Sequence, residues 1–339
     1  MTAARHAMEV VDVPEPGVPG VGELLVRPEV VGLCGSDFHY FHGHLADAVY
    51  PRVQGHEFSA VVEAVGPGCP AGLSTGLRVA VWPLSACGHC YPCRIGRENA
   101  CVSLSLIGVH VDGALQERLI VPATQAYPVD GLDARLAAFI EPMSIAVRTV
   151  ARARVEAGER VLVLGAGPIG QAVAIAALDR GATVLLADVL ASRLERARSS
   201  GADVMCLAEG DDVAARARDW AGGEAPEVVV EATGAKEPMR AALEAVAPAG
   251  RLVVVALSDH DVPLRVGALA FRELDVLGVS CCNGEEFGSA AELVSRRRDA
   301  VAPLLTHDFP LEEAPRAIAY AIEHPDEVVK ALIHVGAEA

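Results

Sequence analysis

The chain has 339 residues, of which 52% are hydrophobic and 22% charged, and its formal net charge is −17. No apolar run reaches the ~18 residues of a membrane span, and the acidic balance argues against nucleic acid and anionic membranes as partners. The N-terminus lacks an apolar h-region, and nine cysteines are too few for a disulfide scaffold. We therefore expect a two-domain protein of the reducing cytoplasm.

The first part of the chain, to about residue 142, predicts a loop-rich β domain. Short apolar and β-branched segments alternate there with glycine and proline, which is the pattern of strands bounded by turns. The expected strands are 23–28, 59–65, 78–82 and 115–121.

Beyond residue 142 strand and helix patterns alternate, which predicts βαβ units and a parallel sheet. The expected helices are 144–153, 171–179, 194–199 and 238–246, and the expected strands are 160–164, 183–187, 227–231 and 251–256. The tail, from about residue 285, has helical stretches at 289–297 and 311–322 and a final strand at 328–335.

Four cysteines form a C-x2-C-x2-C-x7-C run: Cys87, Cys90, Cys93 and Cys101. Thiolates at this spacing can surround one tetrahedral Zn²⁺ ion and leave no open position, so such a site shapes a loop and does no chemistry. The alternatives are two disulfides or four unrelated thiols. Two C-x-x-C turns that share a cysteine favour metal.

A glycine-rich turn follows the strand expected at 160–164 and opens the next helix. Its residues are Gly165, Gly167, Pro168, Ile169 and Gly170, and Asp188 ends the following strand. This context is typical of a dinucleotide site, with the pyrophosphate at the helix N-terminus and the carboxylate on the adenosine ribose. Asp188 would repel a 2′-phosphate, which favours NAD over NADP. Arg193 could serve such a phosphate, cover the adenine face or simply be exposed.

A second set of metal-ligand residues is dispersed: Cys34, His56 and Glu57, with Glu141 at the expected junction of the two domains. We expect the 34–39 and 55–57 segments to be loops of the β domain. Three protein ligands would leave a fourth position for water or substrate, as in catalytic zinc sites. These residues alone do not choose between Glu57 and Glu141 as the third ligand.

Together these segments closely resemble the zinc-containing medium-chain dehydrogenases over nearly the whole chain. The likeness is greatest to the polyol and sugar-acid branch, which includes sorbitol, L-threonine and L-galactonate or L-gulonate 5-dehydrogenases. Residues 107–113 and 140–142 carry the similarity to the sugar-acid members.

The resemblance implies an α/β fold with two parts, a GroES-like β-rich catalytic domain and a Rossmann domain with a doubly wound parallel sheet. The implied bounds are 1–145 for the catalytic domain with a structural zinc lobe at 87–101, 146–285 for the NAD-binding domain, and 286–339 for a segment that returns to the catalytic domain. The family's active site lies in the cleft between the domains, and its members are usually homodimers or homotetramers.

The resemblance also implies residue roles. Cys34, His56 and Glu57 would bind a catalytic zinc, with Glu141 as a ligand or close neighbour, and Asp37 would orient the His56 ring. Lys330 would balance the buried carboxylates. In the implied reaction Ser36, the cofactor ribose and His39 carry the proton of an alcohol away, and hydride passes to C4 of the nicotinamide.

For substrate contacts we expect Tyr40, Phe41, His42, His44 and His110. The 38–44 run is rich in aromatic residues and histidine, and the alternative is that it is a packed loop. The family arginine near residues 278–283 is replaced by Ser280 or Cys281, which weakens the sugar-acid assignment and favours a neutral polyol or cyclitol. An L-threonine-type amino-alcohol dehydrogenase and a non-catalytic NAD-binding protein are the alternatives.

Overall fold

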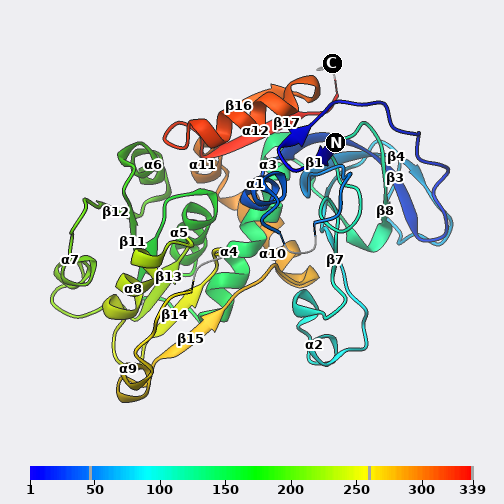
Figure 1. Cartoon of the computed structure of the whole chain (residues 1–339). Helices are drawn as coiled ribbons and strands as arrows, with labels where there is room; N and C mark the ends of the chain where they lie inside the picture. Colours follow the sequence, from blue (N-terminus) through cyan, green and yellow to red (C-terminus); the bar gives the residue numbers. More distant parts are fainter. Residues whose placement is uncertain (46–47, 259–260, 337–339) are drawn as a thin grey trace. The chain divides into compact units, whose positions relative to one another are not determined.

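The computed structural model describes residues 1–45, 48–258 and 261–336. The chain forms two compact units (Figure 1). The first comprises Met1–Glu141, Asn283–Arg296 and the segment from Leu305 on, and the second comprises Pro142–Cys282 and Arg297–Leu304. The chain thus leaves the first unit at Glu141 and returns to it at Asn283 and again at Leu305.

The first unit is built on a seven-stranded sheet with the order β16-β17-β3-β4-β5-β9, in which β8 also pairs with β3. Its longest strand, β3, buries alternate side chains such as Leu24 and Val26, as expected of a strand with one face on a core. The strands are β3 (Glu23–Gly32), β4 (Glu57–Val65), β5 (Arg78–Val81), β8 (Leu119–Pro122), β9 (Ala126–Pro128), β16 (Leu305–Pro310) and β17 (Lys330–His334).

The pairing of β17 with β3 joins the end of the chain to its beginning. The two strands are antiparallel, with Ile333 opposite Val31. β3 also pairs with β4, with Val31 opposite Phe58. Residues of β17, β3 and β4 therefore share one core.

Within the described residues, two small β pairs, five α-helices and short 3-10 turns complete the first unit. The pair β6 and β7 closes the base of the lobe that carries Cys87 to Cys101. The elements are β1 (Thr2–Ala4), β2 (Ala7–Met8), β6 (Leu84–Ser85), β7 (Ser105–Leu106), α1 (Gly35–His42), α2 (Tyr91–Arg94), α3 (Ala134–Ala138), α10 (Gly284–Arg296) and α12 (Ala314–Glu323).

The second unit has the predicted parallel sheet, with the order β12-β11-β10-β13-β14-β15. Its strands are β10 (Arg160–Leu164), β11 (Thr183–Asp188), β12 (Asp203–Cys206), β13 (Val228–Glu231), β14 (Arg251–Val254) and β15 (Asp275–Gly278). The strand order reverses beside β10, and ligands of such sheets bind at the carboxyl ends of the strands at that point. The turn that begins at Gly165 lies there.

Helices flank this sheet, and α5 packs against β10 and β11 while α8 packs against β13. The helices are α5 (Pro168–Asp179), α6 (Ala191–Ala197), α7 (Val213–Trp220), α8 (Lys236–Ala245), α9 (Val266–Phe271) and α11 (Arg298–Val301). Helix α4 (Ile140–Arg152) begins in the first unit and continues into the second. Within the described ranges, no helix is both long and apolar enough to cross a lipid bilayer.

One prediction of local structure is wrong. The segment after Cys34 is the helix α1, not a loop, and Glu57 is the first residue of β4. Capping at both ends stabilises this short helix. Asp37 in the first turn accepts the Cys34 backbone N–H, and Gly43 ends the last turn in the left-handed conformation, with φ 71°. Eight residues are too few for hydrophobic periodicity to reveal such a helix.

Candidate functional site

Cys34 occupies the N-cap of α1, with extended backbone angles of φ −94° and ψ 156°. The Asp37 carboxylate accepts the Cys34 backbone N–H at 2.9 Å and so holds the cap in place. The start of α1 thus fixes the position of Cys34, whose sulfur is a suitable zinc ligand.

His56 and Glu57 are positioned by a loop that packs against the residues before them. The Gly113 and Leu115 N–H groups donate to the carbonyls of Val53 and Gln54, at 2.7 and 3.0 Å. A Cβ on Gly113 would overlap the Gly55 carbonyl oxygen, so this approach requires glycine. The segment that predicted the sugar-acid likeness therefore serves to fix the backbone at His56.

The structure brings Cys34, His56 and Glu57 together, with one ligand atom from each within 4.8 Å of the others. His56 and Glu57 are buried and Cys34 is half-buried. Among the residues that the structure describes, the group consists of these three residues and does not include Glu141. A Cβ at position 32 would overlap Oε2 of Glu57, so Gly32 on β3 leaves room for that carboxylate.

Several buried ionisable groups surround these three residues. Burial alone would lower the pKa of His56, but Asp37, Cys34 and Glu141 raise it well above its ordinary range. Burial and the Glu57 carboxylate raise the pKa of Glu141 to about 7. Buried carboxylates at close range repel each other unless a positive charge lies among them, and the Lys330 ammonium, 2.8 and 2.6 Å from the Glu57 oxygens, supplies one. The donor set of sulfur, nitrogen and oxygen suits Zn²⁺, so the residues fit that ion.

The polar neighbours of His56 come from α1. The Ser36 hydroxyl lies 3.3 Å from His56 Nε2, and Asp37 Oδ1 lies 4.0 Å from Nδ1. His39 is half-buried one helical turn after Ser36, and its ring centroid lies 6.2 Å from that of His44. Asp37 is thus on the side of the ring where an orienting carboxylate belongs.

Two buried polar residues that the sequence analysis missed connect to Asp37. Gln54 Nε2 lies 3.1 Å from the Asp37 carbonyl oxygen and 3.2 Å from Asp37 Oδ1. The Thr2 hydroxyl donates to Gln54 Oε1, and Thr2 and Gln54 are both 0% exposed. No local pattern marks Gln54, which follows Arg52 and Val53, and its partner Thr2 on β1 is 52 residues away.

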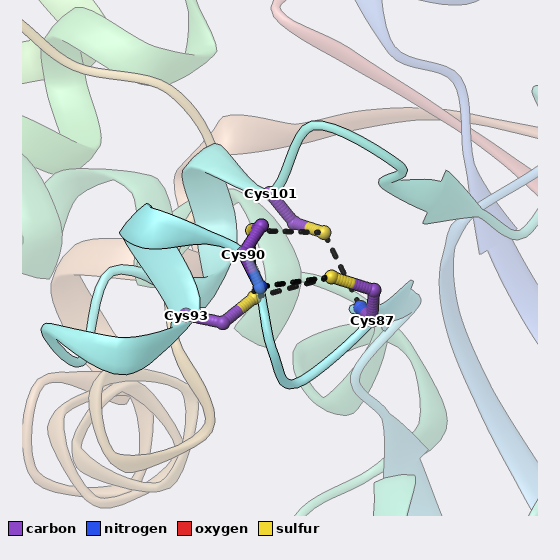
Figure 2. Close-up of side chains that lie close together, drawn as sticks. All are labelled: Cys87, Cys90, Cys93 and Cys101. Carbon is purple, nitrogen blue, oxygen red and sulfur yellow. Dashed lines mark hydrogen bonds between the residues drawn. The ribbon is translucent and has the colours of Figure 1, made fainter.

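The four cysteines of the lobe converge as Figure 2 shows. The Sγ–Sγ distances are 3.3 Å for Cys90–Cys93, 3.8 Å for Cys90–Cys101 and 4.0 Å for Cys87–Cys93. Sulfur ligands about 2.3 Å from a tetrahedral zinc lie roughly 3.8 Å apart. Backbone N–H groups of Cys93 and Val102 lower the pKa of Cys90 to about 6, which favours its thiolate. All four are free cysteines, so the geometry fits a metal and not a pair of disulfides.

The turn after β10 has the shape of a phosphate-binding loop. Gly165 has φ +102°, and a Cβ on Gly170 would overlap the Gly165 carbonyl oxygen, so both positions require glycine. Nothing lies within 4 Å of a Cβ placed on Gly167, so its surroundings are open for close approach of a ligand. Pro168 and Ile169 then begin α5. The turn therefore fits a dinucleotide pyrophosphate.

Asp188 ends β11 and is 8% exposed. Its Oδ2 accepts the Ala166 N–H at 2.6 Å and its Oδ1 accepts the Leu190 N–H at 2.9 Å. Each oxygen has a second lone pair that is free to accept a ribose hydroxyl. Arg193 is half-buried in α6.

The residues predicted to contact substrate have different environments, and half-buried His42 is the last residue of α1. Tyr40 is 0% exposed and its hydroxyl donates to the Val49 carbonyl, so this side chain belongs to the core and that placement does not suit a substrate contact. Phe41 is half-buried, and its ring packs edge-on against His6. His44 is exposed, as is His110, whose Nδ1 accepts the Leu106 N–H at 3.0 Å.

Family comparisons cover both units. Residues 20–131 match the alcohol dehydrogenase GroES-like domain, and residues 168–296 match the zinc-binding dehydrogenase domain. The chain is 33% identical to L-galactonate-5-dehydrogenase of Escherichia coli K12 over 93% of each chain. It is 36% identical to sorbitol dehydrogenase of Gallus gallus, over 88% of this chain and 86% of the relative.

Solved structures agree with this likeness. An alcohol dehydrogenase of Escherichia coli CFT073 complexed with NADH superposes with a TM-score of 0.89 at 29% identity, over 98% of each chain. A zinc-binding dehydrogenase of Sinorhizobium meliloti 1021 bound to NADP gives a TM-score of 0.89 at 30% identity, again over 98% of each chain. The predicted fold class, a GroES-like domain with a Rossmann domain, is confirmed, and zinc with a nicotinamide cofactor is supported.

Proposed function

Because the chain belongs to the zinc-type alcohol dehydrogenases, we propose that it oxidises a secondary alcohol of a polyol, cyclitol or sugar acid and reduces NAD. The observation that carries the proposal is the convergence of Cys34, His56 and Glu57 on one point. The substrate class is supported by relatives that act on L-galactonate and sorbitol.

In this proposal Cys34, His56 and Glu57 hold the catalytic zinc, and Glu141 is the carboxylate that can exchange with Glu57. Bound zinc supplies a Lewis acid that makes the hydroxyl of an alcohol more acidic. Cys87, Cys90, Cys93 and Cys101 hold a second, structural zinc. Lys330 balances the Glu57 carboxylate, because its ammonium donates to both oxygens.

The residues of α1 handle the proton. The Ser36 hydroxyl, beside His56, accepts the alcohol proton and passes its own onward, and half-buried His39 delivers the proton to solvent. Asp37 holds the His56 ring in place. The N-terminus of α5 would hold the pyrophosphate of the cofactor and Asp188 its adenosine ribose, and a bound nicotinamide would supply the hydride acceptor.

We propose NAD and not NADP as the cofactor because the negative charge of Asp188 would repel the 2′-phosphate of NADP. A 2′-phosphate would approach a carboxylate that is already held by two N–H groups and cannot turn away. The missing arginine near residues 278–283, where Ser280 and Cys281 stand, favours a neutral polyol or cyclitol over a sugar acid.

An NAD-reduction screen over polyols, cyclitols, aldonates and L-threonine tests the substrate class. Turnover of a polyol, cyclitol or aldonate supports the proposal, whereas turnover of L-threonine alone would assign an amino-alcohol dehydrogenase. Cys34→Ser should abolish turnover and leave the fold and NAD binding intact, and Cys206→Ser, at an exposed cysteine, is the matched control. Full activity of Cys34→Ser would contradict the proposed zinc mechanism.

We further propose a homodimer or homotetramer in the cytoplasm that binds neither nucleic acid nor membrane. The support is β15, an edge strand with exposed Val276, next to α9, whose Phe271 is 93% exposed. Exposed apolar edges of this kind commonly pair with another chain. Light scattering of the pure protein tests the assembly, and a monomer at all concentrations would contradict it.

A further inference from the structure

Imidazoles at the end of α1 form a cluster distinct from both candidate zinc groups. His42 is the last residue of α1, and His6 lies in the turn between β1 and β2. Their Nδ1 atoms are 3.3 Å apart. Two nitrogen ligands about 2.1 Å from a tetrahedral ion lie roughly 3.4 Å apart. The separation therefore matches that of two ligands on one metal ion.

His6 is held by contacts with α1. Its backbone N–H donates to the Phe41 carbonyl at 2.8 Å, and its ring packs edge-on against the Phe41 ring, with centroids 5.5 Å apart. Its φ is +61°, a left-handed conformation that suits the tight turn between β1 and β2 and that histidine adopts more readily than most residues. The backbone hydrogen bond and the ring contact thus hold His6 beside the end of α1.

His42 is restrained on its other sides. The His44 ring stacks on it, with centroids 5.7 Å apart, and the Arg5 side chain covers Gly43, which ends the helix. Burial lowers the pKa of His42 and so favours the neutral imidazole, which has the free lone pair that a metal requires.

We propose that His6 and His42 bind a divalent transition-metal ion, such as Ni²⁺, Cu²⁺ or Zn²⁺, through their Nδ1 atoms, with water in the other positions. Imidazole ligands select these ions over Mg²⁺ and Ca²⁺. The ion replaces the proton that the two nitrogens otherwise share, and it fastens the β1–β2 hairpin to α1, whose first turn carries Ser36. This site does not depend on the proposed catalytic role of Cys34.

Calorimetric titration of the untagged full-length chain with Ni²⁺ tests the proposal, after the cysteine-containing sites have been loaded with zinc and more weakly bound zinc has been removed by dialysis. We expect one additional Ni²⁺ per chain. His6→Gln and His42→Gln should each weaken its binding by at least the ~10-fold that loss of an outer-sphere partner causes. The matched control is His324→Gln, at a 41% exposed histidine beside Glu327, which should bind Ni²⁺ like the parent.

Two results would overturn the site: no additional Ni²⁺ bound by the parent chain, or unchanged binding by His6→Gln. His6 is exposed, so the His6→Gln variant should fold. Its Ni²⁺ binding therefore tests the site even if the His42→Gln variant fails to fold. Electron paramagnetic resonance of bound Cu²⁺ gives a second readout. We expect nitrogen coupling from two imidazoles in the parent and from one in His6→Gln.

Discussion

The Lys330 ammonium lies 2.8 and 2.6 Å from the two carboxylate oxygens of Glu57, across 273 residues of chain. It also donates to the Leu33 carbonyl at 3.0 Å. The two side chains are 2% and 1% exposed, so this is a fully buried ion pair between β17 and β4. It places a compensating charge directly behind a candidate zinc ligand.

Lys330→Met should destabilise the protein by about 3–5 kcal/mol, because it leaves the Glu57 carboxylate buried without its partner. The free energy of unfolding in urea measures this. The double variant Lys330→Met/Glu57→Gln should recover much of the loss, since it removes both charges. Equal losses in the single and double variants would show that the side-chain volume of Lys330, not its charge, stabilises the fold.

Gln54→Leu should loosen the catalytic zinc, because the Gln54 amide holds Asp37, which faces His56. We expect zinc loss to a chelator from this group to accelerate by roughly 10- to 100-fold, the usual effect of an outer-sphere partner. Gln125→Leu is the control, since Gln125 is also buried but bonds to Leu84 and Ser85. Similar acceleration in both variants would mean that any buried glutamine matters equally.

Cys93→Ser should reduce the zinc content from about two ions per chain to about one, because three thiolates hold a structural zinc poorly. Metal analysis by atomic emission measures the content, and thermal unfolding should show a lower Tm. Cys69→Ser serves as control, since Cys69 is a half-buried cysteine of the same unit outside both groups. An unchanged zinc content in Cys93→Ser would contradict the proposal that these four cysteines bind a structural zinc.

Asp188→Ser should shift cofactor preference toward NADP, because it removes the carboxylate that would repel a 2′-phosphate. We expect the ratio of kcat/KM for NADP to that for NAD to rise roughly tenfold, which corresponds to ~1.4 kcal/mol. Asp203→Ser, on β12, should leave the ratio unchanged. A parent enzyme that already prefers NADP would contradict the assignment of Asp188.

Glu227 provides a pH-dependent contribution to stability. Partial burial pushes the pKa of Glu227 up, but hydrogen bonds from the Arg160 side chain and backbone N–H outweigh it, so the pKa is lowered. A carboxylate whose pKa is lower in the folded state stabilises the fold at pH values above its unfolded-state pKa of about 4.3. This stabilisation is lost as the pH falls through the folded-state pKa.

Glu227→Gln should therefore cost about 1–2 kcal/mol at pH 7, and its difference from the parent should narrow as the pH falls from about 5 to about 3. Urea unfolding at several pH values measures the difference. Glu224→Gln should cost less, because Glu224 also contacts Arg160 but is 77% exposed. If the difference in unfolding free energy between Glu227→Gln and the parent grew as the pH fell, the pKa of Glu227 would be raised by folding and not lowered.

Features close together in the sequence were predictable from it. The cysteines from Cys87 to Cys101 and the glycines from Gly165 to Gly170 each lie within a short segment, and their spacing predicts their geometry. The parallel sheet also followed from the alternation of strand and helix patterns. These features depend on local chain geometry, which the order of residues largely determines.

Residues far apart in the sequence were brought together by the fold alone. The family resemblance implied that Cys34, His56 and Glu57 share a metal and that Lys330 balances buried carboxylates. The pairing of β3 with β4 and of β17 with β3 is what brings Lys330 to Glu57. The contact of His6 with His42 likewise depends on the packing of a hairpin turn against α1. The sequence by itself determined which chemical groups this protein has and where its local turns and strands lie. The tertiary structure decided which groups meet, because strand register and packing, not sequence proximity, set those distances.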